Sequence, residues 1–142
     1  MFSKACKYAI RAVLYLAVHT DKENKLGTKD IAEALEVPAP FLAKILQQLS
    51  RHHLLSSSKG TGGGFYLSDE QFGITLMEVI EVVDGPDVLN SCILGLPECS
   101  SEHPCPLHKK VISARIDLLD LIKNQTIEVL AKRINKKNLN LK

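Results

Sequence analysis

Three cysteines and a histidine lie close together in the sequence and could bind a metal. The spacing is Cys92-x6-Cys99-x5-Cys105, and His108 follows the third cysteine by three residues. Three thiolates and one imidazole form a soft ligand set that suits zinc or an iron–sulfur cluster. Structural zinc usually takes ligands about two to four residues apart. The wider gaps therefore favour a bulkier cofactor, and zinc stays open as an alternative.

The same residues admit other interpretations. If a helix begins at Pro106, Cys105 is its N-cap, where free amides and the helix dipole favour a thiolate. His103 is a second candidate for the fourth ligand. A nucleophilic pair of Cys105 and His108 would lack an orienting group and an oxyanion site, so catalysis is not expected. The alternative to a metal site is three free cysteines in a loop. Cys6 stands alone on an alanine-rich segment and is expected to be a small core residue.

Length and composition describe one domain, or a small domain with an extra arm. The 142 residues are 45% hydrophobic with a net charge of +2, and no apolar run approaches the roughly 20 residues that cross a bilayer. Basic residues interrupt the apolar N-terminal run and no cleavage site follows, so we expect a helix there and not a signal peptide. We therefore expect a cytoplasmic protein without a membrane partner, whose reduced thiols serve metal or redox chemistry.

The first half of the chain has the pattern of a helix-turn-helix. Helical periodicity covers residues 3–20, Thr28 caps a short second helix, and Pro38 or Pro40 suits the first turn of a third helix. The third helix has an inward apolar stripe, so its polar and basic side chains can reach base edges and phosphates. The residues of this unit expected to face DNA are Thr28, Lys29, Pro38, Ala39, Pro40, Lys44, Gln47, Gln48 and Arg51.

A glycine-rich hairpin follows the third helix. Leu54–Ser57 and Phe65–Leu67 are expected to pair across a tip whose glycines permit positive φ and close backbone approach. A nucleotide-binding phosphate loop is excluded because Lys59 precedes the glycines and no Gly-Lys-Ser/Thr follows them. The hairpin is expected to be a wing that reaches a minor groove, and a merely structural hairpin is the alternative. The wing residues expected to contact DNA are Lys59, Gly60, Thr61 and Gly62.

The second half of the chain is expected to carry a dimer interface. Thr75–Asp84 is predicted to form a short amphipathic helix, and apolar residues at helical spacing continue from Pro106 to about Ile134. This pattern predicts one long helix that no other segment can cover. Its expected partner is the copy of itself in a second chain, which would present two recognition helices to a palindromic site. Packing back on the same domain is the alternative.

These elements define the expected organisation. Residues 1–84 form a DNA-binding domain, 85–105 a cysteine-rich cluster-binding loop, 106–134 a dimerisation helix and 135–142 a basic tail. The fold class is mainly α with a small β-hairpin: a winged helix-turn-helix DNA-binding domain plus a long C-terminal dimerisation helix.

The segments together resemble a bacterial family, the winged-helix iron–sulfur cluster transcriptional regulators (IscR/NsrR-like). The resemblance covers nearly the whole chain and runs through "KYAIRAVLYLA", "IAEALEVPAPFLAKILQQL", "KGTGGGFYL", "ITLMEVIEVVDG" and the three-cysteine loop that ends in "CPLH". It implies a homodimeric, DNA-binding transcription factor that represses or activates as its cluster changes. It also implies that the third helix enters the major groove and the wing enters the minor groove.

The resemblance also implies a ligand set. By position, Cys92, Cys99 and Cys105 would be cluster ligands, and His108 the fourth, as in the cluster-assembly branch of the family. Such a set can hold either cluster type, and we place [2Fe-2S] slightly ahead of [4Fe-4S].

The chain departs from the family at three places. Six residues separate the first two loop cysteines, one more than the family usually has. Lys7 stands where the nitric-oxide-sensing branch has an acidic ligand from the partner chain. Ala43 replaces an acid that helps the cluster-assembly branch to choose between DNA sites, so the resemblance implies no site preference.

Placement of the loop suggests a mechanism. We hypothesise that cluster occupancy or redox state changes how the two DNA-reading heads are set relative to one another. One alternative is a winged-helix regulator without a cluster that senses through thiol oxidation, zinc or a protein partner. The other is an interaction module whose helix-turn-helix docks a protein instead of DNA. An enzyme is not expected.

Overall fold

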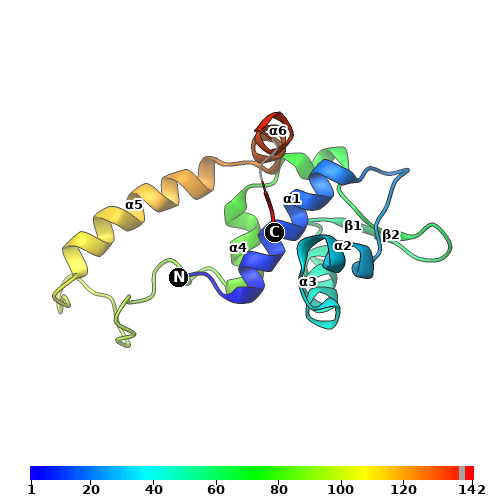
Figure 1. The fold of residues 1–142 in the computed structure, drawn as a ribbon. Helices are drawn as coiled ribbons and strands as arrows, with labels where there is room; N and C mark the ends of the chain where they lie inside the picture. Colours follow the sequence, from blue (N-terminus) through cyan, green and yellow to red (C-terminus); the bar gives the residue numbers. More distant parts are fainter. Residues whose placement is uncertain (138–139) are drawn as a thin grey trace.

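The helices and strands follow the order expected from the sequence. The computed structural model describes residues 1–137 and 140–142, so residues 138–139 of the predicted basic tail lie outside the described residues. Figure 1 shows the elements, which are α1 (Lys4–His19), α2 (Thr28–Leu35), α3 (Ala39–Arg51), β1 (Ser56–Ser58), β2 (Gly64–Tyr66), the 3-10 turn η1 (Asp69–Gly73), α4 (Leu76–Asp84), α5 (His108–Asn124) and α6 (Ile127–Lys137). The expected mainly α fold with a small β-hairpin is confirmed.

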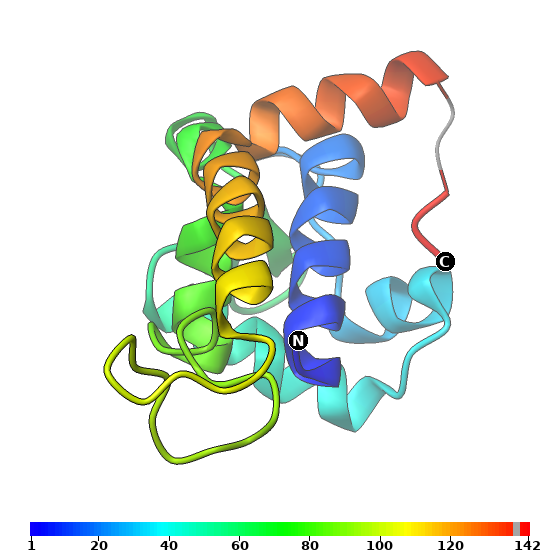
Figure 2. The same ribbon diagram turned by 90° about the vertical axis from the view of Figure 1, so that its left-hand side faces the viewer.

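The winged domain packs around α1. The Ser3 hydroxyl caps this helix by accepting a hydrogen bond from the backbone N–H of Cys6 at 3.0 Å. α2, α3, α4 and α6 all contact α1, and Figure 2 shows α6 crossing the C-terminal end of α1. Small side chains on α1 allow this close approach. The buried residues of α1 are Cys6, Ala9, Ala12, Val13, Leu14, Leu16 and Ala17.

α2 and α3 are joined by a tight turn. α2 begins one residue earlier than expected, because Gly27 and not Thr28 is its N-cap. The Gly27 N–H donates to the Asp30 carboxylate at 3.2 Å. Glu36 ends α2 in the left-handed region, with φ 56° and ψ 48°. Pro38 is the N-cap of α3, and Pro40 lies in its first turn, where the sequence analysis places Pro38 or Pro40. This connection sets α3 against α1 and α2.

The hairpin after α3 is tied to the loop before α2. β1 and β2 pair antiparallel, with Ser57 opposite Phe65. The Leu26 N–H donates to the Phe65 carbonyl at 3.0 Å, and the Phe65 N–H donates to the Leu26 carbonyl at 2.7 Å. Gly64 has φ 145°, and a Cβ there would lie 2.6 Å from the Leu26 carbonyl oxygen. Only glycine allows this approach, so the wing depends on it.

The prediction of one helix over 106–134 is wrong. α5 and α6 are separate helices, and the chain is extended between them at Gln125. The Leu76 N–H donates to the Gln125 carbonyl at 3.0 Å, and the Ile127 N–H donates to the Ile74 carbonyl at 2.8 Å. Ile127 is fully buried in the main core. α6, which carries the second half of the predicted apolar stripe, therefore packs against α1 of its own domain.

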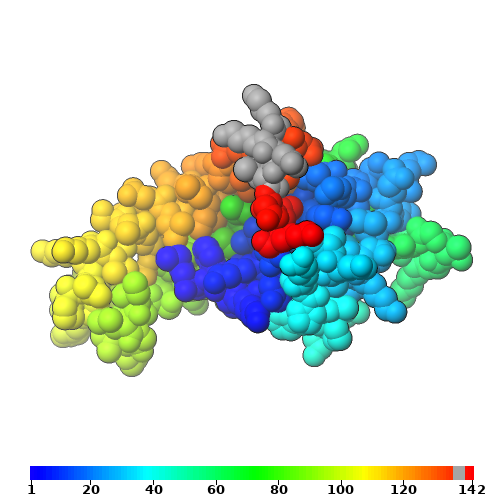
Figure 3. Space-filling model, viewed as in Figure 1, coloured from blue at the N-terminus to red at the C-terminus, as the bar shows by residue number. Residues whose placement is uncertain are grey.

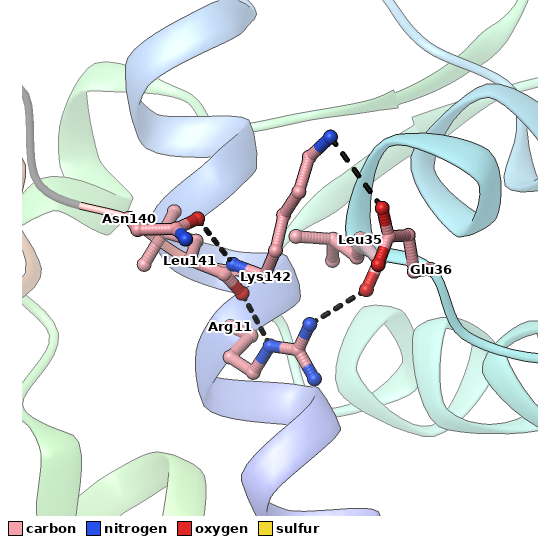
Figure 4. A network of polar contacts seen from close by, with 6 residues as sticks. All are labelled: Arg11, Leu35, Glu36, Asn140, Leu141 and Lys142. Carbon is pink, nitrogen blue, oxygen red and sulfur yellow. Dashed lines mark hydrogen bonds and ion pairs between the residues drawn. The ribbon is translucent and has the colours of Figure 1, made fainter.

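The last residues also return to the helix-turn-helix, as Figure 4 shows. The Arg11 guanidinium donates to the Leu141 carbonyl at 2.5 Å and to the Leu35 carbonyl, at the end of α2, at 2.6 Å. The Lys142 ammonium lies 3.7 Å from the Glu36 carboxylate. Residues 140–142 are therefore docked against α1 and α2, and α6 extends to Lys137, into the segment expected as a basic tail from residue 135.

The wing and the cysteine loop lie at opposite ends of the molecule. The space-filling view of Figure 3 shows the wing projecting at one end, while α5 and the segment before it project at the other. Among the described residues, no helix combines the length and the apolar character needed to cross a membrane. Any influence of the loop on DNA contact must pass through the helices between these ends.

Candidate functional site

The residues expected to face DNA lie at the surface of α2, α3 and the wing. The buried residues of α3 are all aliphatic, which turns its cations outward, where they can meet phosphates. The exposed members are Lys29, Pro38, Pro40, Lys44, Gln47, Arg51, Lys59, Gly60, Thr61 and Gly62. The partly buried members are Thr28, Ala39 and Gln48.

Gln48 is directed at a neighbouring helix. Its side-chain amide nitrogen donates a 2.7 Å hydrogen bond to the backbone carbonyl of Val82 in α4. This bond is partly buried and ties α3 to α4. We therefore assign Gln48 to the packing of α3 and correct the expectation that it faces DNA.

Lys25 is a candidate DNA contact that the sequence patterns did not single out. Its ammonium group lies 5.4 Å from the centre of the Tyr66 ring, within the range of a cation–π contact. Leu26, the next residue, forms the bridge to the wing, so Lys25 is held at the base of the hairpin. The sequence does show a lysine just before the helix-turn-helix. Its position at the hairpin depends on the bridge from Leu26, which the sequence pattern does not reveal.

A small apolar core anchors the start of the cysteine loop and the far end of α5. This core joins Cys6 of α1, Ile80 of α4, Leu89 at the start of the loop and Ile122 of α5. Gly85, with φ 86°, ends α4 and turns the chain outward. The loop is therefore anchored where it leaves α4 and near the far end of α5.

Cys6 is a core residue, as expected. It is fully buried. Burial, together with the neighbouring Asp84 carboxylate, raises the pKa of its thiol to about 12. The Ser3 N–H donates to the same carboxylate at 2.8 Å, and the Ser3 hydroxyl donates to it as well. A thiol that stays protonated is a poor metal ligand, so Cys6 serves packing at the junction of α1 and α4.

The four predicted ligands stand as two pairs. Cys99 Sγ lies 3.6 Å from His108 Nδ1, and the Ser101 hydroxyl lies 3.3 Å from Nε2 of the same ring. The Cys105 side chain lies near enough to Cys92 to lower the pKa of the Cys92 thiol. Within residues 1–137 and 140–142, no group of three or more His, Cys, Asp or Glu side chains is arranged to hold a metal ion. A four-ligand site requires the two pairs to approach each other.

α5 begins at His108, two residues later than the expected start at Pro106. Leu107 is its N-cap, and the His108 N–H donates to the Cys105 carbonyl at 3.0 Å. Cys105 therefore lies in the turn before α5, and the argument from the helix dipole does not apply to it. His108 is only 6% exposed, which fixes its imidazole against the loop.

The sulfur of Cys92 lies among hydrogen-bond donors. The backbone N–H of Leu96, and then that of Leu94, lower the pKa of the Cys92 thiol by donating to its sulfur. The Cys105 thiol and the charge of Arg115 act in the same direction. Hydrogen bonds of this kind favour a thiolate and tune the sulfurs of a cluster. The structure thus places the first loop cysteine in surroundings suited to a metal ligand.

The donor chemistry of the loop fits an iron–sulfur cluster. Cys92, Cys99 and Cys105 are free and partly exposed, and the nearly buried imidazole of His108 supplies a nitrogen ligand. Residues 92–107, which carry the three cysteines, contain no regular helix or strand. Bringing the two pairs together therefore changes the loop and not the fold. Zinc would use the same four donors.

The helix-turn-helix, its wing and the separate cysteine loop define a winged-helix transcriptional regulator. The model of the Rrf2 family, described as "Iron-dependent Transcriptional regulator", matches residues 2–133. The chain belongs to the Rrf2 family. Proteins of this family are named as transcriptional regulators and not as enzymes, in agreement with the sequence analysis.

Named relatives support the resemblance found in the sequence. An HTH-type transcriptional regulator of Aquifex aeolicus is 34% identical over 130 residues, which are 90% of this chain and 89% of the relative. The regulator IscR of Xenorhabdus nematophila is 30% identical over 136 residues, covering 89% and 82%. The repressor NsrR of Streptomyces coelicolor is 27% identical over 105 residues, covering 74% and 66%. The IscR/NsrR-like assignment is confirmed.

Solved structures share the fold. CymR, described as the global cysteine regulator of B. subtilis, matches with a TM-score of 0.74 and 24% identity, covering 94% of this chain and 97% of CymR. The IscR of T. potens matches with a TM-score of 0.70 and 21% identity, covering 99% and 93%. The winged-helix fold is therefore confirmed.

Gln47 and Gln48 should respond differently to substitution by alanine. Gln48→Ala should lower the free energy of unfolding by about 1 kcal/mol, because the Val82 carbonyl loses its partner. Gln47→Ala should leave stability unchanged and weaken binding to operator DNA, because Gln47 is exposed on α3. Urea unfolding followed by circular dichroism and DNA binding followed by fluorescence anisotropy measure the two effects. The assignment is wrong if Gln48→Ala unfolds like the unsubstituted protein and loses DNA affinity.

Proposed function

We propose that this chain is a dimeric DNA-binding transcriptional regulator whose DNA binding is controlled by an iron–sulfur cluster in the cysteine loop. The ligands would be Cys92, Cys99, Cys105 and His108. One observation carries the proposal: three free thiols on the loop between α4 and α5 and the nearly buried imidazole at the first residue of α5 lie in two pairs. When bound, the cluster supplies a redox-active and chemically labile link between these pairs.

The exposed face of α5 supports dimerisation. In Figure 1, α5 extends away from the winged domain. Ile116 is 59% exposed and Leu121 is 56% exposed, whereas Ile122 is buried against α4 and the start of the loop. Large exposed apolar side chains on a protruding helix favour burial against a second copy. A twofold dimer would place two α3 helices on a palindromic site about one DNA turn apart.

The contacts between loop and winged domain indicate how a signal would travel. Asp84, the last residue of α4, holds the start of α1 through Ser3. Two residues earlier, the Val82 carbonyl holds α3 through Gln48. A change in the loop that moves the end of α4 would therefore act on both α1 and the recognition helix. The cluster must favour one of the resulting arrangements over the other to control DNA binding.

The second candidate is a regulator without a cluster that senses through thiol oxidation, zinc or a protein partner. The nearness of the Cys105 side chain to Cys92 supports sensing by thiol oxidation, because it brings two thiols together. The lowered pKa of the Cys92 thiol would make that sulfur the nucleophile toward an oxidant. Iron content separates the two candidates.

Replacement of Cys92, Cys99 and Cys105 by alanine should remove control without unfolding the protein. In the unsubstituted protein, cluster-loaded and iron-free preparations should differ in DNA affinity by about five- to 150-fold, the usual range of coupling between two sites. The triple variant should have the iron-free affinity in both preparations. Anaerobic anisotropy titrations on operator fragments selected with the protein measure this.

Cys6→Ala is the matched control, because Cys6 is buried outside the loop, and this variant should keep the difference between the two preparations. A triple variant that binds every fragment like the loaded protein would rule out cluster control.

Ile116→Glu should convert the dimer to a monomer, because it places a charge in the proposed apolar interface. Lys123→Glu, at an exposed position of the same helix, is the matched control and should stay dimeric. Sedimentation velocity gives the mass of each variant. The α5 interface is refuted if Ile116→Glu remains a dimer at concentrations where the unsubstituted protein is dimeric.

A further inference from the structure

Arg115 is a charged residue within the apolar pattern of α5, and its side chain contacts the cysteine loop. One guanidinium nitrogen donates to the Asn90 carbonyl at 3.3 Å, and the other donates to the Ser91 carbonyl at 2.7 Å. Asn90 and Ser91 are the two residues immediately before Cys92. The guanidinium therefore binds the backbone from which the first cysteine extends.

The carbonyls that Arg115 binds end a short turn. The N–H groups of Asn90 and Ser91 both donate to the Asp87 carbonyl, at 2.9 and 3.0 Å. The carbonyls at the end of such a turn point away from it and need donors from elsewhere. A planar guanidinium presents several N–H donors in a fixed arrangement and can bind two neighbouring carbonyls at once, which an ammonium group on a flexible stem does poorly.

Arg115 and His108 share one face of α5. They are seven residues apart, so they lie about two helical turns, or roughly 10 Å, from each other along the helix. His108 pairs with Cys99, and Arg115 holds the segment before Cys92. The same helix thus carries the partner of Cys99 and binds the segment that leads to Cys92. The bond to the Ser91 carbonyl also places the positive charge of Arg115 next to Cys92 in the chain.

We propose that Arg115 is the positioning residue of the cluster site: it clamps residues 90–91 to α5, fixes the origin of Cys92 relative to His108, and places a positive charge beside the first ligand. This role rests on the proposed function, because the clamp serves a cluster only if the loop binds one. The clamp itself is a property of the iron-free chain and can be measured there.

Two substitutions separate the hydrogen bonds of Arg115 from its charge. Arg115→Lys keeps the charge but cannot span both carbonyls, and Arg115→Met removes both. Lys123→Met is the matched control, because Lys123 is exposed near the other end of the same helix. Sedimentation velocity and thermal unfolding confirm that all variants are folded in the same assembly.

Hydrogen exchange of the iron-free protein tests the clamp. In both Arg115 variants, amides of residues 90–96 should exchange roughly tenfold faster, because charged hydrogen bonds to the backbone are lost. Lys123→Met should exchange like the unsubstituted protein. Unchanged exchange of residues 90–96 in Arg115→Met overturns the inference, even in a protein that binds a cluster.

The loaded protein tests the positioning and the charge. Both Arg115 variants should release iron to a chelator roughly tenfold faster than the unsubstituted protein. Only Arg115→Met should shift the midpoint potential to more negative values, because a positive charge near a cluster favours its reduced form. Equal potentials in Arg115→Met and the unsubstituted protein would refute the role of the charge. An unsubstituted protein that takes up no cluster refutes the proposed function and the cluster role, while the exchange result still decides the clamp.

Discussion

The small-residue face of α1 packs against α2, α3, α4 and α6 at once, and the other parts of the molecule are placed by this packing. Ala9, Ala12 and Ala17 leave room for neighbouring helices to approach, and Val13 and Leu16 fill the space between them. Burial of such side chains is worth roughly 25 cal/mol per Å² of apolar surface. The recognition helix, the wing and the returning C-terminal helix all take their positions from this one interface.

The cysteine loop is attached to a second, smaller core, which includes Cys6 from the N-terminal turn of α1 and Ile80 from α4. α4 also binds α3, because its Val82 carbonyl accepts a hydrogen bond from Gln48. α4 therefore belongs to both parts of the molecule, and a rearrangement of the loop reaches the recognition helix by moving one short helix. The contrast between a packed core and an attached loop suits a regulator, because the loop can change while the DNA-reading surface keeps its internal structure.

The winged domain could be predicted from local patterns, because caps, prolines and apolar periodicity all agree there. The proline in the first turn of α3 and the burial of Cys6 follow from such local rules. The break at Gln125 could not be predicted, because periodicity is the same whether a stripe faces a second chain or its own domain. The contacts of Gln48 and Arg115 could not be predicted for a related reason: helical position gives the direction of a side chain, and only the tertiary structure shows the carbonyls that it binds. In the loop, sequence spacing identified the donors but could not give their pairing.

The most direct test of the account is the visible absorption spectrum of the protein purified without oxygen, with iron and acid-labile sulfide counted per chain. The account predicts broad sulfur-to-iron absorption bands with iron and sulfide in matching amounts, and their loss when the loop cysteines are replaced. A colourless protein that contains no iron, even after reconstitution with iron and sulfide, would contradict it.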